Sequence, residues 1–318
     1  MRLALALLLA SVLAAPAFAQ EPVLRTLTPS IVKVGKWAEG VAFDGNSLWV
    51  AESGQRSIAQ IARDGSVQRH ANVGRLPVNM AALPGGRIFA LVKTDQVVWR
   101  HLPREAGGRP LKWLPDYPQA IAAEGSALWV LTELGRVYRI DATTGSDKST
   151  ESLGEHAMAI AAAHGKVWVG HAGEPRLSVI DPQSLAAERI GVDGAELWAL
   201  TANRSGLFAG GRIKGSKANG LIVSIDPQSR RETNRLRIDE FTEVMTADDE
   251  TLVAVGTEGT IWIIAAKDFT LQAKIKLSVG TYSPQSALIH DGKLVVVAQQ
   301  YQGENGAVFT LDDWRARP

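Results

Sequence analysis

Short apolar runs separated by polar turns recur along this chain at a nearly constant interval. Each run is rich in β-branched or aromatic side chains and follows a glycine or a polar turn. The seven central triplets are Leu48-Trp49-Val50, Ile88-Phe89-Ala90, Leu128-Trp129-Val130, Val167-Trp168-Val169, Leu207-Phe208-Ala209, Leu252-Val253-Ala254 and Leu294-Val295-Val296. The steps between their middle residues are 40, 40, 39, 40, 45 and 42 residues. Such runs predict buried strands, and their regular spacing predicts a repeat architecture.

Each repeat contains more than its central strand. An alanine-rich strand and a turn precede it, as in residues 40–46, and a polar loop and a third strand follow it, as in residues 136–140. A turn then leads to a fourth strand, and the turn Asp181-Pro182-Gln183-Ser184 recurs as Asp226-Pro227-Gln228-Ser229. Aspartate and proline suit such turns because they bond to their own backbone or preset φ. We therefore expect four strands in each repeat of about 40 residues.

Seven repeats of four strands indicate an all-β fold, a seven-bladed β-propeller with four-stranded blades. A row of separate sandwich domains is the alternative, but even spacing without Pro- or Ser-rich linkers argues against it. Small alanines in each first strand fit a ring, because these strands crowd together near its axis. We expect Trp49, Trp129 and Trp168, at the centres of second strands, to pack between neighbouring blades.

The two ends of the chain suggest how the ring closes. The seventh repeat supplies only three strands, within residues 286–289, 294–299 and 306–311, whereas an unassigned strand at residues 25–34 precedes the first repeat. A propeller lacks open edges only when its last blade is complete. We therefore predict that the N-terminal strand completes the seventh blade, and that deletion of residues 21–35 destabilises the whole ring.

The first residues have the pattern of a secretory signal peptide. A positive charge at Arg2 precedes an apolar run over residues 3–14, and Ala17-Phe18-Ala19 matches the small-x-small cleavage pattern. A membrane anchor is the alternative, but the apolar run is too short to span a bilayer. We predict a signal peptide at residues 1–19, a single propeller domain at residues 20–318, and a periplasmic or secreted protein.

Composition narrows the classes of function. The 318-residue chain contains no cysteine, which excludes disulfides, thiolate metal sites and a cysteine nucleophile. Lysine and arginine total 34 against 33 aspartates and glutamates, so the overall charge does not attract nucleic acid. No membrane span follows the signal peptide. We expect neither a nucleic-acid partner nor a membrane-spanning segment, and we expect a monomer.

The repeats resemble those of two groups of bacterial propellers. Leu48-Trp49-Val50-Ala51-Glu52, residues 128–133 and Gly220-Leu221-Ile222-Val223-Ser224-Ile225-Asp226-Pro227 look like the blades of YVTN-type propellers and of the related streptogramin (virginiamycin B) lyases. The resemblance covers nearly the whole mature chain and concerns how a blade is built. Periplasmic YVTN propellers of the YncE kind imply a binding protein. The lyases imply an enzyme that opens an ester by elimination, with His and Glu residues near a Mg ion.

The lyase pattern of two histidines and a glutamate late in the chain is not reproduced. The last two repeats offer only His290 with Glu250 and Glu258. The sequence also lacks the GxSxG, HExxH, phosphate-loop and calcium-loop motifs. The nearest approach to a ligand pair is His171 with Glu174, on a predicted loop where spacing does not fix geometry. We therefore predict no catalytic residues and no bound metal.

Ligands of propellers usually meet the loops that join strand four to the next strand one, and strand two to strand three, around the central channel. Positions ten and twelve residues before each central residue, and those just after strand two, fall in this region. The predicted ligand-binding residues at the channel mouth are Trp37, Glu39, Glu52, Asn79, Tyr117, Gln119, Glu133, His156, His171, Trp198, Arg212, Glu243, Gln285 and Gln299. Aromatic bodies with a few polar groups suit a small-molecule or peptide pocket. The alternative is that repeat composition alone produces such a ring.

These observations favour an exported, non-enzymatic propeller that binds a peptide, a protein partner or a small cell-envelope ligand at the channel mouth, without a cofactor. The first alternative is a metal-assisted lyase or lactonase with Mg or Ca, in which Glu39, Glu52, His171 or Glu243 act as ligands or acid/base groups. The second is a structural subunit of an envelope complex.

Overall fold

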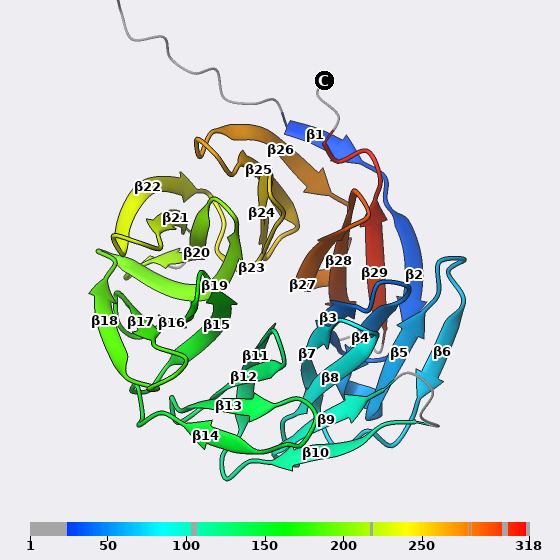
Figure 1. The fold of residues 1–318 in the computed structure, drawn as a ribbon. Helices are drawn as coiled ribbons and strands as arrows, with labels where there is room; N and C mark the ends of the chain where they lie inside the picture. The colour runs from blue at the N-terminus through cyan, green and yellow to red at the C-terminus, as the bar shows by residue number, and fades with distance from the viewer. Residues whose placement is uncertain are drawn as a thin grey trace, which may run out of the picture.

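A computed structural model describes residues 24–102, 107–216, 219–278, 280, 282–300 and 305–315. Seven sheets stand around a central axis and form the predicted seven-bladed propeller (Figure 1). Six sheets have four strands and one has five. The predicted signal peptide at residues 1–19 lies outside the described residues. No helix in the described ranges is long and apolar enough to cross a membrane.

In the first four blades, four consecutive strands follow one another from the channel to the outer edge of the ring. Blade 1 consists of β3 (Ala38–Phe43), β4 (Leu48–Glu52), β5 (Ser57–Ile61) and β6 (Val67–His70), with a 3₁₀ turn η1 (Ser53–Gln55). Blade 2 consists of β7 (Pro77–Leu83), β8 (Arg87–Val92), β9 (Val97–His101) and β10 (Arg109–Trp113). Blade 3 consists of β11 (Pro118–Glu124), β12 (Ala127–Thr132), β13 (Val137–Asp141) and β14 (Asp147–Ser149). Blade 4 consists of β15 (Ala157–Ala163), β16 (Lys166–His171), β17 (Arg176–Ile180) and β18 (Ala187–Gly191).

The last three blades include the ends of the described chain. Blade 5 consists of β19 (Ala195–Asn203), β20 (Gly206–Ile213), β21 (Gly220–Asp226) and β22 (Arg231–Ile238). Blade 6 consists of β23 (Thr242–Ala247), β24 (Thr251–Gly256), β25 (Thr260–Ala265) and β26 (Leu271–Leu277), to which β1 (Leu24–Leu27) adds a fifth strand. Blade 7 consists of β27 (Tyr282–His290), β28 (Lys293–Gln300), β29 (Gly306–Leu311) and β2 (Ser30–Val34).

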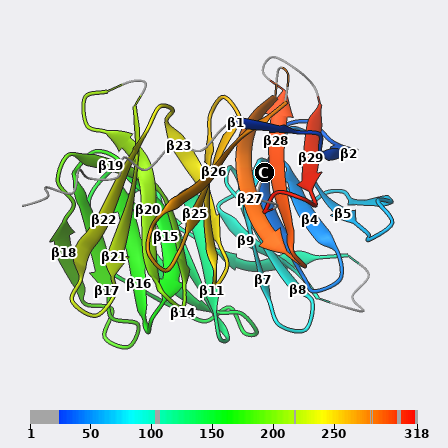
Figure 2. The same ribbon diagram turned by 90° about the horizontal axis from the view of Figure 1, so that it is seen from above.

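The ring closes as the sequence predicts, because β2 pairs antiparallel with β29 and completes blade 7. The predicted strand over residues 25–34 is wrong in one respect, since the structure divides it into two strands. Residues 24–27 pair in parallel with β26 of blade 6, and Figure 2 shows β1 beside β26 and β2 beside β29. Pro29 lies between the two strands and has no N–H to donate, which explains the division. The N-terminal segment therefore joins two blades.

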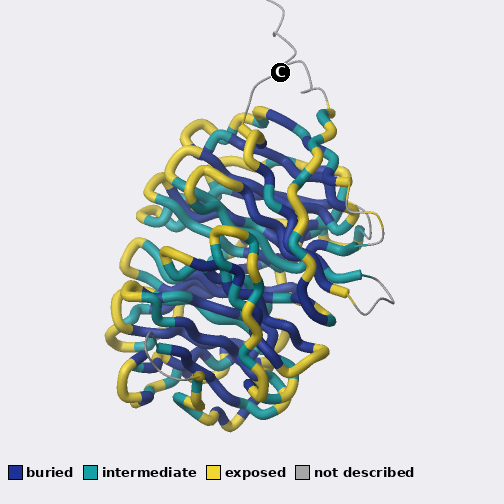
Figure 3. The backbone as a smooth tube through the Cα atoms, turned by 90° about the vertical axis from the view of Figure 1, so that its right-hand side faces the viewer, coloured by how far each residue is buried: buried dark blue, intermediate teal, exposed yellow. Residues whose placement is uncertain are grey.

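The hydrophobic core consists of seven clusters, and each cluster lies between two neighbouring blades. Trp49, Trp129 and Trp168 are at most 2% exposed and belong to three of these clusters, so their predicted place between blades is confirmed. Figure 3 shows buried strand segments inside and exposed turns outside. The first strands, which lie nearest the channel, contain buried and half-buried positions.

The turn motif between third and fourth strands acts structurally. The Asp141 carboxylate accepts the backbone N–H groups of Thr143 and Thr144 at 3.0 and 2.7 Å. Asp181 and Asp226 bond to their own turns in the same manner. These aspartates fix the turn by bonding the backbone two and three residues ahead.

Candidate functional site

Every first strand carries a β-bulge at the same place in its blade. The register of β3, β7, β11, β15, β19, β23 and β27 shifts against the second strand near its start. The residues at these bulges are Glu39, Asn79, Gln119, Met158, Trp198, Glu243 and Gln285, and all except Met158 belong to the predicted ligand-binding set. A bulge leaves a residue out of the ladder and re-aims its side chain. Because each first strand contacts the first strand of the next blade, the seven bulges form one ring around the channel.

The ring has two chemically different walls. Blades 7, 1, 2 and 3 present Gln285, Glu39, Asn79 and Gln119, which are three carboxamides and one carboxyl. Blades 4 and 5 present the apolar Met158 and Trp198, and Glu243 of blade 6 lies between Trp198 and Gln285 of the polar wall. All but Glu243 are half-buried. A channel of this kind offers hydrogen bonds on one side and apolar area on the other.

Lys93 organises the polar wall. It follows β8, and its Nζ lies 2.7 Å from Glu133 Oε1 and donates to Gln119 Oε1 at 3.3 Å. Asn79 Nδ2 donates to the Gln119 backbone oxygen at 3.1 Å. These contacts connect blades 2 and 3 at the mouth end of the ring. They neutralise Lys93 and hold the amide of Gln119 in one orientation.

Glu39 is the carboxyl group of the polar wall, and a hydroxyl group is its hydrogen-bond donor. Its Oε1 accepts a hydrogen bond from Ser53 Oγ at 2.7 Å. Burial raises the pKa of the Glu39 carboxyl above its usual value, against the opposing effects of the Ser53 hydrogen bond and the Lys93 charge. Ser286 of blade 7 donates from Oγ to the Glu39 backbone oxygen, so the closing blade holds this bulge in place.

Arg212 organises the opposite wall. Its Nε donates to Glu196 Oε2, and its Cζ lies 5.7 Å from the ring centre of Trp198 and 5.9 Å from that of Phe241. The two aromatic rings meet edge to face with centroids 5.4 Å apart. A guanidinium over aromatic faces is a favourable cation–π arrangement. This contact joins blades 5 and 6 at the mouth.

Glu243 lies next to this cation and aromatic cluster. Its outer part is exposed, yet desolvation by its neighbours raises the pKa of its carboxyl, against the opposing charge of Arg212. Trp198 Nε1 is buried and has no hydrogen-bond partner among the described residues. Two carboxyls of raised pKa, Glu39 and Glu243, therefore lie on blades 1 and 6, with Gln285 of blade 7 between them.

The remaining predicted residues of the ring vary in exposure. Trp37 and Tyr117 are 51% and 44% exposed, and His156 is also exposed. Gln285 Nε2 donates to the Ser283 backbone oxygen at 3.2 Å, and Gln299 is half-buried. Exposed aromatic side chains around a polar ring add apolar contact area to the mouth.

The structure does not bring Glu52 and His171 into the ring. Both are fully buried, with 0% exposure. Glu52 accepts hydrogen bonds from the Gly35 N–H at 2.6 Å and from Ser57 Oγ at 2.5 Å. It is also paired with Arg69 at 3.2 Å. Glu52 therefore ties blade 1 to the segment that closes the ring and lies inside the blade.

His171 is held inside blade 4. Its Nε2 lies 2.9 Å from Ser178 Oγ and 3.0 Å from Arg176 Nη1. Burial, helped by the Arg176 charge, lowers the pKa of His171 to about 4. Glu174 pairs with the same arginine at 2.5 Å and does not form a ligand pair with His171. Both residues support the blade.

An offset of one position in the repeat explains why Glu52 and His171 are buried while the other predicted residues after second strands lie at the mouth. Lys93, Glu133, Arg212 and Gln299 lie four residues after the central residue of their strands, whereas Glu52 and His171 lie three residues after it. Side chains alternate between faces, so a shift of one residue moves a side chain from the rim into the blade. Ser53 occupies the rim position in blade 1, and the sequence prediction missed it. Aligning the seven repeats would have identified Ser53, because it places Ser53 at the same position as Lys93 and Glu133.

The residues of the alternative lyase pattern lie apart. His290 ends β27 and Glu250 lies in the turn before β24, so both are at the end of the blades opposite the mouth. Glu258 lies in the turn after β24, at the mouth end. Among the described residues, no group of three or more His, Asp or Glu side chains is placed to hold a metal ion.

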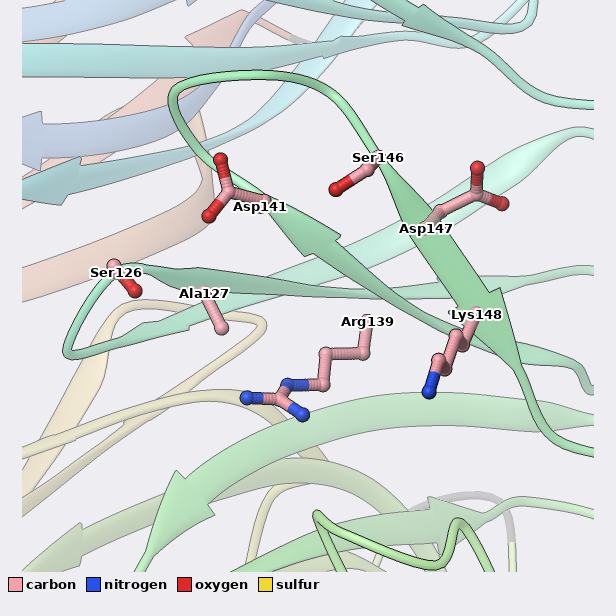
Figure 4. Close-up of a pocket in the computed structure, with 7 residues that line it drawn as sticks. All are labelled: Ser126, Ala127, Arg139, Asp141, Ser146, Asp147 and Lys148. Carbon is pink, nitrogen blue, oxygen red and sulfur yellow. The ribbon is translucent and has the colours of Figure 1, made fainter.

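A hollow of about 280 Å³ lies on blade 3 at the end away from the mouth (Figure 4). Arg139 and Lys148 extend along one side of it and Asp141 lies on the other. Asp141 holds its own turn, and Asp147 is paired with Lys112. The charges around this hollow therefore serve the blade, and the ring at the mouth remains the candidate site.

Comparisons with known proteins support the fold. No protein-family profile and no curated protein matches the chain. A streptogramin B lyase structure matches with a TM-score of 0.73 at 12% identity, covering 89% of this chain and 98% of that chain. A catalytically inactive virginiamycin B lyase from Staphylococcus aureus with quinupristin matches with a TM-score of 0.74 at 13% identity, covering 89% and 100%. At this identity the likeness shows a shared seven-bladed fold, and the fold does not fix the activity.

Proposed function

We propose that this protein is an exported binding protein that holds a peptide, a partner segment or a small cell-envelope ligand at the channel mouth. The observation that carries the proposal is the bulge repeated at the same place in the first strand of all seven blades, next to the channel. Bulges at functional sites serve to re-aim side chains. A packing role alone would not need such different residues at equivalent positions.

The two walls define the chemistry of the ligand. Met158, Trp198 and Phe241 offer apolar area, and Asn79, Gln119 and Gln285 offer amide donors and acceptors. The ligand therefore has one apolar side and one edge that forms hydrogen bonds. An extended peptide and many small envelope compounds have this character.

The test uses wall variants and a matched control. Protein isolated from its own cells is examined by native mass spectrometry for a bound ligand, and affinity for that ligand is measured with Trp198→Ala and Gln119→Ala. Each variant is expected to weaken binding about ten-fold or more. Gln183→Ala, in an exposed turn of blade 4 at the other end, serves as the control for Gln119. Equal affinity of all three variants would contradict the mouth site.

The lyase alternative rests on the fold shared with streptogramin lyases. If it holds, the protein purified with its native metal contains stoichiometric Mg or Ca and converts quinupristin to a linear product. Metal analysis and mass spectrometry of the reaction measure both. Unchanged quinupristin after incubation with Mg would reject this alternative. Turnover abolished by Glu39→Gln and Glu243→Gln would establish it in place of the binding role.

A further inference from the structure

Trp113 departs from its repeat in a way that packing does not explain. A buried apolar residue ends the fourth strand or comes shortly after it in every blade: Val34, Val73, Leu114, Leu153, Val192, Ile238 and Leu277. The residue before it is Lys33, Asn72, Trp113, Ser152, Gly191, Arg237 and Lys276. Six blades thus have a polar residue or glycine there. Only blade 2 has an aromatic side chain, and it is 65% exposed.

Trp113 forms one wall of a hollow of about 520 Å³, which is within the size range of ligand pockets. The buried Val92 also lines it. Arg75, Thr94, Asp95 and Gln96 form its polar edge. The hollow lies outside the ring of bulges, because these residues belong to the loops before β7 and between β8 and β9.

The charges at the polar edge cancel. Asp95 accepts the backbone N–H of Arg75 at 2.7 Å and its Nε at 2.6 Å. These hydrogen bonds hold the pKa of Asp95 below its usual value. The side chains of Thr94 and Gln96 make no hydrogen bond within the part of the chain that the structure describes. The hollow therefore offers neutral hydrogen-bonding groups beside an exposed indole.

Gln96 occupies a backbone position where glycine is favoured. Its φ is 55°, and its carbonyl accepts the N–H of Leu114 at 2.7 Å. The carbonyl that makes this bond in blades 3 and 6 belongs to Gly135 and Gly259, whose φ values are also positive. A side chain in the left-handed region costs free energy. Blade 2 therefore retains an amide side chain at the hollow although glycine would suit the turn better.

We propose that this hollow binds a neutral saccharide unit. A pyranose ring presents a C–H face that stacks on an indole and hydroxyls that exchange hydrogen bonds with an amide, a hydroxyl and a guanidinium. The two charged side chains that line the hollow, Arg75 and Asp95, are paired with each other, so neither is left free for an ionic ligand group. The unpaired polar side chains disfavour a wholly apolar ligand, because binding one would leave them desolvated.

The test is titration calorimetry of the full chain with chitotetraose, cellotetraose and maltotetraose up to about 10 mM. At least one of these is expected to bind, with affinity lowered about ten-fold or more by Trp113→Ala and less by Trp113→Phe. Trp113 is exposed, so both variants are expected to keep the native melting temperature. Absence of binding for all three sugars overturns the proposal, as does equal binding by Trp113→Ala.

A second variant separates the site from the fold. Gln96→Gly is expected to raise the melting temperature by about 1 to 3 °C and to weaken saccharide binding. His164→Gly, in an exposed turn of blade 4 with φ of 55°, is the control and is expected to raise the melting temperature without changing binding. Trp198→Ala, in the bulge ring, is expected to leave saccharide affinity unchanged, which distinguishes this site from the channel mouth. Trp113-dependent binding of a proline-rich peptide or of spermidine without sugar binding would assign a different ligand and overturn the proposal.

Discussion

Glu52 and Glu133 are both glutamates near the end of a second strand, yet they occupy opposite environments. Glu52 is fully buried and accepts hydrogen bonds from Gly35 and Ser57, whereas Glu133 is exposed and pairs with Lys93 at the rim. The two positions differ by one residue relative to the repeat. In blade 4, His171 and Ala172 occupy the equivalent two positions, and both are buried.

The difference teaches that the mouth and the framework share the same strands. Side-chain alternation assigns one residue to the blade and the next to the rim. The buried residue then determines stability, while the rim residue sets the charge and shape of the channel. Substitutions at the two positions should therefore affect different measurements, and their effects should differ in size.

The largest effect is expected for Glu52→Ala. The change leaves the Gly35 N–H and the Ser57 hydroxyl without their acceptor and removes the partner of Arg69. Loss of a buried, bonded carboxylate is expected to lower the free energy of unfolding by about 3 kcal/mol. Urea denaturation measures the change.

Glu133→Ala is the matched control for Glu52→Ala. It breaks an ion pair in which Glu133 is 43% exposed. Such pairs contribute little, so the free energy of unfolding is expected to change by less than about 0.5 kcal/mol. Similar losses for the two variants would contradict the division between framework and rim.

The next effect is a pH dependence that arises from His171. Its pKa is lowered from 6.5 to about 4 by burial and by Arg176. Below the unfolded pKa the unfolded chain binds a proton that the folded chain does not, so stability falls as pH decreases from 6.5 to 4. Between about pH 7 and about pH 4.5, His171 is expected to contribute a loss of about 2 kcal/mol. Urea midpoints across this range measure it.

His171→Gln isolates this contribution. Glutamine can still bond to Ser178 but does not titrate. The difference between wild type and variant should therefore shrink as pH falls, because only the wild type bears the cost of keeping a buried histidine neutral. A constant difference across the range would show that His171 does not titrate in this way.

Arg212→Met probes the rim. Methionine keeps apolar contact with Trp198 and Phe241 but removes the charge and the hydrogen bond to Glu196. The pKa of Glu243 is expected to rise further, because the charge of Arg212 now lowers it. Carboxyl NMR titration measures this pKa. The free energy of unfolding should fall by only about 1 kcal/mol, and an unchanged Glu243 pKa would place Arg212 outside the site.

The smallest effect has the opposite sign. Burial raises the pKa of Glu39, so the ionised carboxyl is disfavoured at neutral pH. Glu39→Gln removes that cost and is expected to stabilise the protein by at most about 1 kcal/mol at neutral pH, with a smaller gain near the unfolded pKa. Thermal unfolding at two pH values measures it. Destabilisation at neutral pH would mean that the carboxylate supports the framework as Glu52 does.

Much of the fold could be predicted from the sequence, because the repeat determines the number of blades and the strands within each blade. The spacing of the seven central residues determined the number of blades, and the missing fourth strand of the last repeat indicated closure by the N-terminal strand, which β2 confirms. The bulge positions also follow from the repeat, since each lies ten residues before a central residue. The proposed roles of these residues remain predictions.

Other features depend on geometry that spacing does not show. The prediction grouped Glu52 with Glu133, because loop residues counted along the chain do not reveal which face each side chain takes. The contact of Arg212 with Phe241 joins two blades and arises only when the sheets stand side by side. Pro29 was a visible signal for the break between β1 and β2, but its effect on pairing required the neighbouring β26.

The pairing of β2 with β29 also determines when the fold can form. Ser30 donates from its hydroxyl to the Thr310 carbonyl across 280 positions of the chain. Contacts of such long range cost loop-closure entropy and form late in folding. Synthesis must therefore reach the last strand before the ring can close. The finished ring forms only when β2 and β29 are both present.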